Sequence, residues 1–224
     1  MTFLFKWEWL PKLASGLLVT VEVTATCIAI GFVLGILLAL ARVYGRRLLS
    51  VPANIFIQFF RGTPLLVQLL LVYVALPQLG ITISALLSAI LALGLNTAAY
   101  QAEYFRGAIQ SVKKGQMLAA RSLGMSLPQS IRFVILPQAL RLVIPAWSNE
   151  LILMLKGSSI VYIVTILDIM GESKRIANKY FNYLDVYVVA ALFYLALVLI
   201  VSLLLRELER RVRIPGLGLH IERR

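Results

Sequence analysis

The chain carries polar and ionisable side chains inside long runs of apolar residues, and these are the residues that could do chemistry. Leaving such a side chain against lipid is costly, so polar groups within a membrane span usually face a bundle interior or a water-filled path. The chemistry open to them is to line a polar cavity or to bond neighbouring helices. The candidates are Glu22, Arg61, Gln68, Asn96, Glu103, Asn149, Glu150 and Lys156.

The spacing of these residues indicates different roles for different members of the set. Asn149 and Lys156 are seven residues apart and share a helix face, with Ser159 one turn further along. That face could line a cavity. For Gln68 and Asn96, hydrogen bonding between helices is an equal alternative. Glu103 and Arg106 are spaced for an ion pair within one helix, and Glu22 is expected to reach water at the outer surface.

Catalytic and metal chemistry is not indicated. His220 is the only histidine, so this chain can build neither a Ser–His arrangement nor a metal site of two histidines. The sequence holds no GxxxxGKS or GxxxxGKT phosphate loop, so it offers no such site for binding a nucleotide. The single cysteine, Cys27, has apolar neighbours and is expected to be a buried, inert thiol.

The composition places the chain in a bilayer. Of its 224 residues 60% are hydrophobic and 14% charged, and the mean hydropathy is +0.88, which leaves too little polar surface for a soluble globule. The net charge of +12 does not indicate nucleic-acid binding, because the basic residues cluster beside apolar runs. The N-terminus is expected to be retained, since its apolar run is too long for a cleaved signal peptide.

Uncharged runs predict an all-α polytopic membrane protein with five transmembrane helices in one domain, residues 1–224. About 20 apolar residues cross the hydrocarbon core as a helix. The run 62–102 is long enough for two crossings, with a turn at Pro77, Gln78 and Gly80 and a start that reaches back before Arg61, near Pro52. The other runs are residues 23–41, 142–167 and 186–205.

Two features of the N-terminal part concern packing. Gly31 and Gly35 form a GxxxG pattern, which predicts only that another helix approaches closely. Aromatic residues before Gly16 fit an interfacial belt on a short helix lying flat on the membrane, with a frayed tail as the alternative. They are Phe3, Phe5, Trp7 and Trp9.

The distribution of Lys and Arg predicts the orientation. Fifteen of them follow the first run, lie between the third and fourth runs, or lie in the C-terminal tail, whereas five lie on the other side. Because cytoplasmic loops carry the excess of basic residues, the N-terminus should be outside and the C-terminus inside.

The cytoplasmic stretch from Gly115 to Pro137 predicts two short helices. Residues 116–123 are good helix formers, Gly124 suits a left-handed C-cap, and Ser126 with Gln129 makes a capping box. Pro137 and Pro145 then bend the chain into the fourth span. The first helix should expose Met117, Leu118 and Leu123 beside the small Ala119 and Ala120, a surface that a partner's groove could accept. A solvated basic loop is the plainer alternative.

Here the sequence resembles the membrane-spanning permease subunit of binding-protein-dependent ABC importers, in the group for polar amino acids such as histidine, glutamine or arginine. That family carries a cytoplasmic Glu-Ala-Ala signature with a later Gly and a closing Leu-Pro. The matching residues are Leu118, Ala119, Ala120, Gly124, Leu136 and Pro137. Further matches over residues 16–205 are FFRGTPLLVQ (59–68), AAYQAEYFRGAI (98–109), LPQALR (136–141) and NELILMLKGSSI (149–160).

The resemblance implies an ATP-driven importer with partners on both sides of the inner membrane. Two cytoplasmic ABC ATPase subunits, which carry ATP and Mg²⁺, would grip residues 115–126 within the coupling segment 112–136. A second permease, identical or homologous, completes the path, and an external solute-binding protein delivers a polar amino acid. This chain itself would bind no cofactor. Leu118 replaces the family's usual Glu, so docking would rest on shape and on Arg121.

The resemblance also suggests residue roles. The ATPase-coupling residues would be Met117, Leu118, Ala119, Ala120, Arg121 and Gly124. The substrate-path residues would be Gln68, Asn96, Asn149, Glu150, Lys156, Ser158 and Ser159, with Lys156 meeting an α-carboxylate. Hydrogen bonds between helices remain an alternative for Lys156 and the two serines.

Two other classes of function stay open at this point. An ion-coupled secondary amino-acid transporter could use Glu150 with Lys156, but it would not need a cytoplasmic docking segment. A non-transporting scaffold would tolerate loss of the polar residues in the spans. A requirement of vesicle uptake for ATP and a separate ATPase separates the three classes.

The predicted orientation can be tested by labelling. In a Cys27→Ser background, a thiol reagent that cannot cross membranes should label a cysteine at Asn178 in intact cells and spare one at Ser111. The reverse pattern would overturn the orientation and, with it, the docking hypothesis.

Overall fold

The computed structural model describes residues 6–212, and that part of the chain is helical throughout its regular structure. Phe3, Phe5, His220 and the tail arginines 213, 223 and 224 lie outside the described residues. The elements are α1 Trp9–Tyr44, α2 Arg47–Gly62, α3 Leu65–Leu70, η1 Leu71–Ala75, η2 Leu76–Leu79, α4 Ala85–Ser111, α5 Lys114–Ser122, α6 Leu127–Ser130, η3 Ile131–Ile135, α7 Leu136–Leu142, α8 Ile144–Gly157, η4 Ser158–Val164, α9 Ile169–Tyr180 and α10 Tyr183–Val212.

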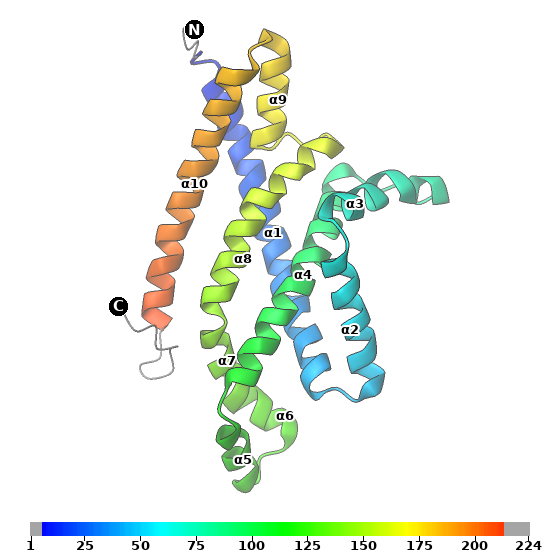
Figure 1. Cartoon of the computed structure of the whole chain (residues 1–224), viewed down its shortest axis with the longest axis vertical. Coiled ribbons are helices and arrows are strands. Elements are labelled where there is room, and N and C mark those ends of the chain that lie inside the picture. Colours follow the sequence, from blue (N-terminus) through cyan, green and yellow to red (C-terminus); the bar gives the residue numbers. More distant parts are fainter. Residues whose placement is uncertain (1–5, 213–224) are drawn as a thin grey trace.

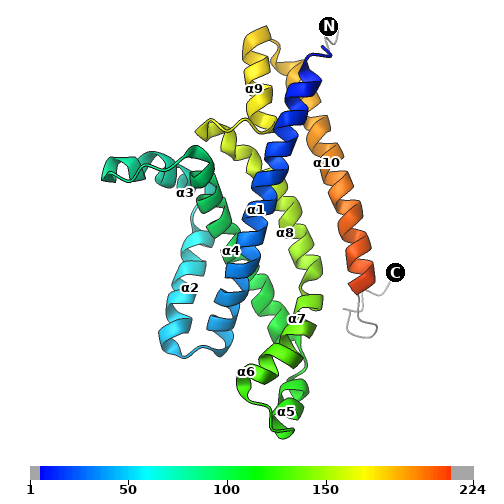
Figure 2. The ribbon, with the colours of Figure 1, turned by 180° about the vertical axis from the view of Figure 1, so that it is seen from behind.

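The long helices run along one direction and the short ones gather at the two ends. Figure 1 shows α9 beside the N-terminal end of α1, whereas α5 and α6 lie at the opposite end of the molecule. Figure 2 shows the same arrangement from behind. The predicted docking segment and α9 are therefore at opposite ends of the bundle.

Three helices of the described part, α1, α4 and α10, are each long and apolar enough to cross a membrane. The count rises to five if each of two bent pairs is one span. These pairs are α2 with residues 65–79, bent by 104°, and residues 127–142 with 144–164, bent by 55°. The number of spans is thus three to five, and the second span is not the continuous helix that its apolar run suggests.

The bend between α2 and residues 65–79 has a local cause. Pro64 lacks an N–H group and disfavours helical geometry in the residue before it, and Thr63 is accordingly extended, with φ −110° and ψ 142°. The segment after the break runs sideways from the bundle (Figure 1). It ends at Gly80, whose φ of +81° confirms the predicted turn.

The most extensive helix contact joins α1 to α4. A Cβ at Gly31 would collide with the amide of Gln101, and a Cβ at Gly35 would lie 2.9 Å from the Cβ of Gln101 and 3.1 Å from the backbone nitrogen of Ala102. Only glycine leaves enough room, so α4 is the helix whose approach the GxxxG pattern predicts.

The N-terminal residues correct one prediction. The helix α1 begins at Trp9 and continues unbroken to Tyr44, so residues 6–15 form no separate flat helix. Trp9 is buried in a cluster with Ile176 and Val186, so its ring is not exposed as an interfacial belt requires. Trp7 is exposed. The side chain of Trp9 was assigned wrongly because hydropathy does not reveal a neighbour that is distant in sequence.

The helix α9 was not predicted, because its basic residues suggested an external loop. Asp168 caps its start by accepting a hydrogen bond from the backbone N–H of Gly171 at 2.8 Å. Tyr194 of α10 donates its hydroxyl hydrogen to the same carboxylate at 3.0 Å. The backbone at Asp168 also packs directly on Gly16 of α1. These contacts fix α9 to α1 and α10.

The glycine contact generates a stability prediction. Gly35→Ala should lower the free energy of unfolding by about 1–3 kcal/mol, because the new Cβ meets backbone atoms of α4 that cannot move independently. Gly107→Ala is the control: it lies on α4 with nothing near the position of its Cβ, and should be neutral or stabilising. Thermal unfolding in detergent measures both, and equal melting temperatures would contradict close packing at Gly35.

Candidate functional site

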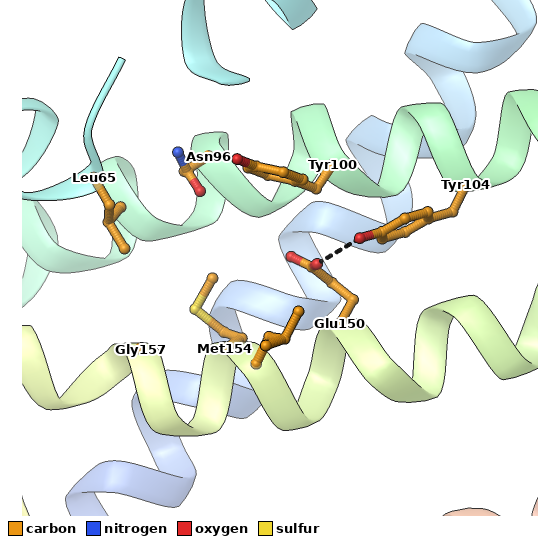
Figure 3. Close-up of a pocket in the computed structure, with 8 residues that line it drawn as sticks. Leu65, Asn96, Tyr100, Tyr104, Glu150, Met154 and Gly157 are labelled. Atoms are coloured by element: carbon orange, nitrogen blue, oxygen red, sulfur yellow. Dashed lines mark hydrogen bonds between the residues drawn. The ribbon is translucent and has the colours of Figure 1, made fainter. Parts of the chain in front are cut away.

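A cavity of about 220 Å³ lies between α3, α4 and α8 (Figure 3). Along α4 its lining residues recur every four positions, which places them on one helix face, and α8 contributes a matching face. The lining residues are Leu65, Asn96, Tyr100, Tyr104, Glu150, Leu153, Met154 and Gly157. Apart from the carboxylate of Glu150, these side chains are neutral.

Glu150 is the only ionisable acid in that lining, and its side chain is 5% exposed. Its Oε1 accepts a hydrogen bond from the hydroxyl of Thr97 at 2.8 Å, and its Oε2 accepts one from Tyr104 at 3.3 Å. Within residues 6–212 no Lys or Arg forms an ion pair with it. A buried carboxylate beside a cavity, hydrogen-bonded but without a counter-charge, suits a cationic group on a ligand.

Gln68 and Asn96 meet at the bend between α2 and α3. The amide of Gln68 donates to the carbonyls of Phe60 at 2.8 Å and Thr63 at 3.0 Å. The amide of Asn96 donates to the Phe60 carbonyl at 3.0 Å and to Oε1 of Gln68 at 3.1 Å. These bonds satisfy carbonyls that the end of α2 leaves without helical partners. Gln68 therefore supports the bend, whereas Asn96 does so and also lines the cavity.

The other predicted path residues lie outside this cavity lining. Asn149 and Lys156 are both exposed in the single chain, which agrees with their sharing one face of α8, and Ser159 is half-buried. Ser158 is fully buried and accepts a hydrogen bond from Thr24 of α1 at 3.4 Å. The geometry of Ser158 thus matches the alternative of bonding between helices.

Glu103 joins three arginines from α1, α2 and α4. The predicted pair with Arg106 is present, at 2.7 Å. Arg42 of α1 also pairs with Glu103, and Arg61 of α2 lies 3.9 Å from it, two contacts that the sequence did not reveal. The Arg61 guanidinium stands 5.4 Å from the ring centre of Tyr100, so this cluster borders the cavity wall.

The docking segment adopts the predicted local structure. Gly124, with φ +83°, follows α5, and the N–H groups of Gly124 and Met125 bond to the carbonyls of Arg121 and Ala120, as in a Schellman motif. The capping box of Ser126 and Gln129 opens α6. Both details confirm the sequence analysis.

The exposure of α5 corrects one coupling residue. Leu118 and Leu123 are 72% and 84% exposed, and Ala119 and Arg121 are exposed as well. Ala120 is 4% exposed, so it packs within its own chain and is not free to meet a partner's groove. Met117 is half-buried beside the cluster of Phe105 and Ile109.

Sequence reasoning missed the residues that surround Glu150, namely Thr97, Gln101, Tyr104 and Trp147. Their hydrogen bonds cross from α4 to α1 and α8. A signal was available, because Thr97, Gln101 and Tyr104 recur at helical spacing on α4. It was not recognised because hydroxyl and indole groups are common at membrane interfaces.

Comparison with known proteins decides the family. Residues 31–214 match the family described as binding-protein-dependent transport system inner membrane component. The chain belongs to this family. The permease is therefore a multi-pass membrane protein of the ABC transporter class.

Several relatives span nearly the whole permease. The probable amino-acid ABC transporter permease protein YckA of Bacillus subtilis (strain 168) is 37% identical over 91% of this chain and 90% of its own length. The arginine transport system permease protein ArtQ of the same strain is 37% identical, covering 91% and 94%. The glutamine transport system permease protein GlnP of Escherichia coli (strain K12) is 35% identical, covering 93% and 96%.

Solved structures agree with the fold. A chain of an amino acid ABC transporter with histidines is 39% identical and superposes with a TM-score of 0.87, covering 94% of the permease and 99% of that chain. A chain of the MetNI methionine ABC transporter is 22% identical with a TM-score of 0.77, covering 94% and 100%, and shows the fold alone. The comparisons give no support to an ion-coupled secondary transporter.

Proposed function

We propose that the permease forms the translocation path of an ATP-driven importer for polar amino acids. The observation that carries this proposal is the buried carboxylate of Glu150, which has no ion-pair partner in the described part of the chain and lies in a cavity whose other lining side chains are neutral. An α-ammonium group supplies the missing positive charge, and the aromatic rings and Met154 accept an apolar stem. The relatives include permeases named for arginine and glutamine transport, which supports the same substrate class.

The exposed polar face of α8 fits a second permease subunit. Asn149 and Lys156 would be costly against lipid, so that face belongs at a water-filled path between two permeases rather than in the hydrocarbon. Ser159 continues the same face. A two-fold dimer, of this chain with itself or with a homologous partner, closes such a path. Lys156 there would meet the substrate carboxylate.

The orientation and the span count belong to the same proposal. The chain crosses the inner membrane five times as one domain, with each bent pair counted as one span, the N-terminus outside and the C-terminus in the cytoplasm. The basic-residue distribution supports this direction. So does the placement of α9 and of α5 with α6 at opposite ends of the molecule (Figure 1).

The proposed partners follow from these two ends. Outside, a solute-binding protein delivers the amino acid. In the cytoplasm, two ABC ATPase subunits bind ATP and Mg²⁺. Each ATPase holds, in a groove on its surface, the helix α5 of one permease, which lies within the coupling segment 112–136. The exposed Leu118, Arg121 and Leu123 make the contact, and the Gly124 turn sets the direction in which the chain leaves α5 toward α6. Closure of the ATPases on nucleotide then drives alternating access.

The cavity assignment can be tested at its carboxylate. Glu150→Gln keeps the shape but removes the charge, and should reduce amino-acid affinity about 10-fold to 100-fold, since hydrogen bonds to charged groups contribute about 1.5–3 kcal/mol. The measurement is uptake into proteoliposomes holding the complete complex. Glu22→Gln, at an exposed acid outside the cavity, is the matched control. Unchanged uptake by the Glu150 variant would remove the cavity from the path.

The docking surface can be tested by comparing exposed and buried positions of α5. Leu118→Asp with Leu123→Asp should weaken ATPase binding at least 10-fold while the permease melts normally, because both leucines are exposed in the single chain. Ala120→Trp should instead lower the melting temperature of the isolated permease, since Ala120 is buried within it. Recovery of stoichiometric ATPase with the double variant would contradict docking through α5.

A further inference from the structure

Gln101 occupies the point where α1, α4 and α8 meet, and its side chain is 0% exposed. Its Nε2 donates to the Ile28 carbonyl of α1 at 3.3 Å and to the hydroxyl oxygen of Thr97 at 3.2 Å. Its Oε1 accepts a hydrogen bond from the indole N–H of Trp147 at 3.0 Å. Gln101 does not line the cavity, but each of its polar atoms is bonded to a different neighbour.

The direction of these bonds follows from the groups themselves. An indole N–H can only donate, so the amide oxygen must face Trp147 and the amide nitrogen must face Thr97. The hydroxyl oxygen of Thr97 then accepts from Gln101, which leaves its single hydrogen for Oε1 of Glu150, at 2.8 Å. Each group in the series Trp147, Gln101, Thr97 therefore donates to the next, and the series ends on the carboxylate.

We propose that Gln101 is a positioning residue for the substrate-binding carboxylate, acting through Thr97. The series holds Oε1 of Glu150 against α4, and leaves the remaining lone pairs of the carboxylate for the substrate ammonium group. This inference rests on the proposed function of the cavity. Substrate affinity then depends on a glutamine that does not touch the substrate.

The close contact of α1 with α4 is part of the same arrangement. A Cβ at Gly31 would occupy the place of the Gln101 amide nitrogen, and the Ile28 carbonyl that receives one of its hydrogens lies on the same helix. The packing of α1 therefore fixes the amide, the amide fixes the Thr97 hydroxyl, and the hydroxyl fixes Glu150. A merely structural network would affect stability and leave substrate affinity unchanged.

The test compares isosteric variants in the complete complex reconstituted with its ATPase and binding protein. Uptake of radiolabelled L-arginine, L-glutamine and L-histidine is measured first with the wild type, and the amino acid that is taken up becomes the probe. Thr97→Val removes the hydroxyl at constant shape, and Thr97→Ser retains it. Gln101→Met removes all three bonds, and Gln101→Glu turns the amide donor into an acceptor beside Thr97.

The expected result is a change in KM with little change in kcat. Thr97→Val and Gln101→Met should raise KM about 5-fold to 20-fold, a loss on the scale of one hydrogen bond to a charged group. Gln101→Glu should raise it further, because its carboxylate competes with Glu150 for the Thr97 hydrogen and repels it. Thr97→Ser should restore the wild-type KM. Ser88→Ala, at a buried serine of α4 that bonds within its own helix, is the control.

The outcomes separate the two levels of inference. If Thr97→Val has the KM of Thr97→Ser, while Glu150→Gln shows its expected loss of affinity, the positioning role is overturned and the cavity assignment stands. If Glu150→Gln transports normally, or the wild type takes up none of the three amino acids, the proposed function fails and the positioning role with it. Should Gln101→Met fail to fold, the valine and serine variants of Thr97 still decide the matter.

Discussion

The fold depends on how closely α4 approaches α1, which Gly31 and Gly35 permit. Lipid offers no hydrogen bonds, so a buried amide must find all its partners within the protein. At this distance Gln101 reaches a backbone carbonyl of α1 without an intervening water. Larger residues at the two glycines would separate the helices, leave the amide unsatisfied and disturb the side chains between α4 and α8. Close packing and polar satisfaction are therefore one constraint here.

The bent second span obeys the same constraint in another way. Breaking a helix inside a membrane protein releases carbonyl groups, and such irregular backbone is tolerated only where protein or water covers it. The amides of Gln68 and Asn96 cover the end of α2, and Asn96 also lines the cavity. The break is thus covered in part by an amide, that of Asn96, which also lines the cavity. The ion-pair cluster around Glu103 joins α1, α2 and α4.

The sequence predicted features that are local in the chain and missed features that depend on distant neighbours. The Gly80 turn, the Gly124 turn and the capping box at Ser126 follow from residue types over a few positions. The buried side chains of Trp9 and Ala120 could not be predicted, because hydropathy gives composition but not the direction in which a side chain points. The bend at Pro64 had a sequence signal, whereas the apolar run around it favoured a continuous span.

The same applies to the site itself. Asn96 and Glu150 were recognised because a polar group in an apolar run stands out, and both line the cavity. The spacing of Thr97 and Gln101 places them on one face of α4, but it does not specify their partners on α1 and α8.

The order of these helices along the chain has a consequence for biogenesis. When α4 has entered the membrane, Gln101 can already bond to α1, but Trp147 and Glu150 belong to a helix that is synthesised later. The early pair therefore carries an amide oxygen and a threonine hydroxyl without their final partners. The arrival of α8 satisfies both and buries its own carboxylate in the same step, so the insertion of an acidic helix is assisted by polar groups that await it in the bilayer.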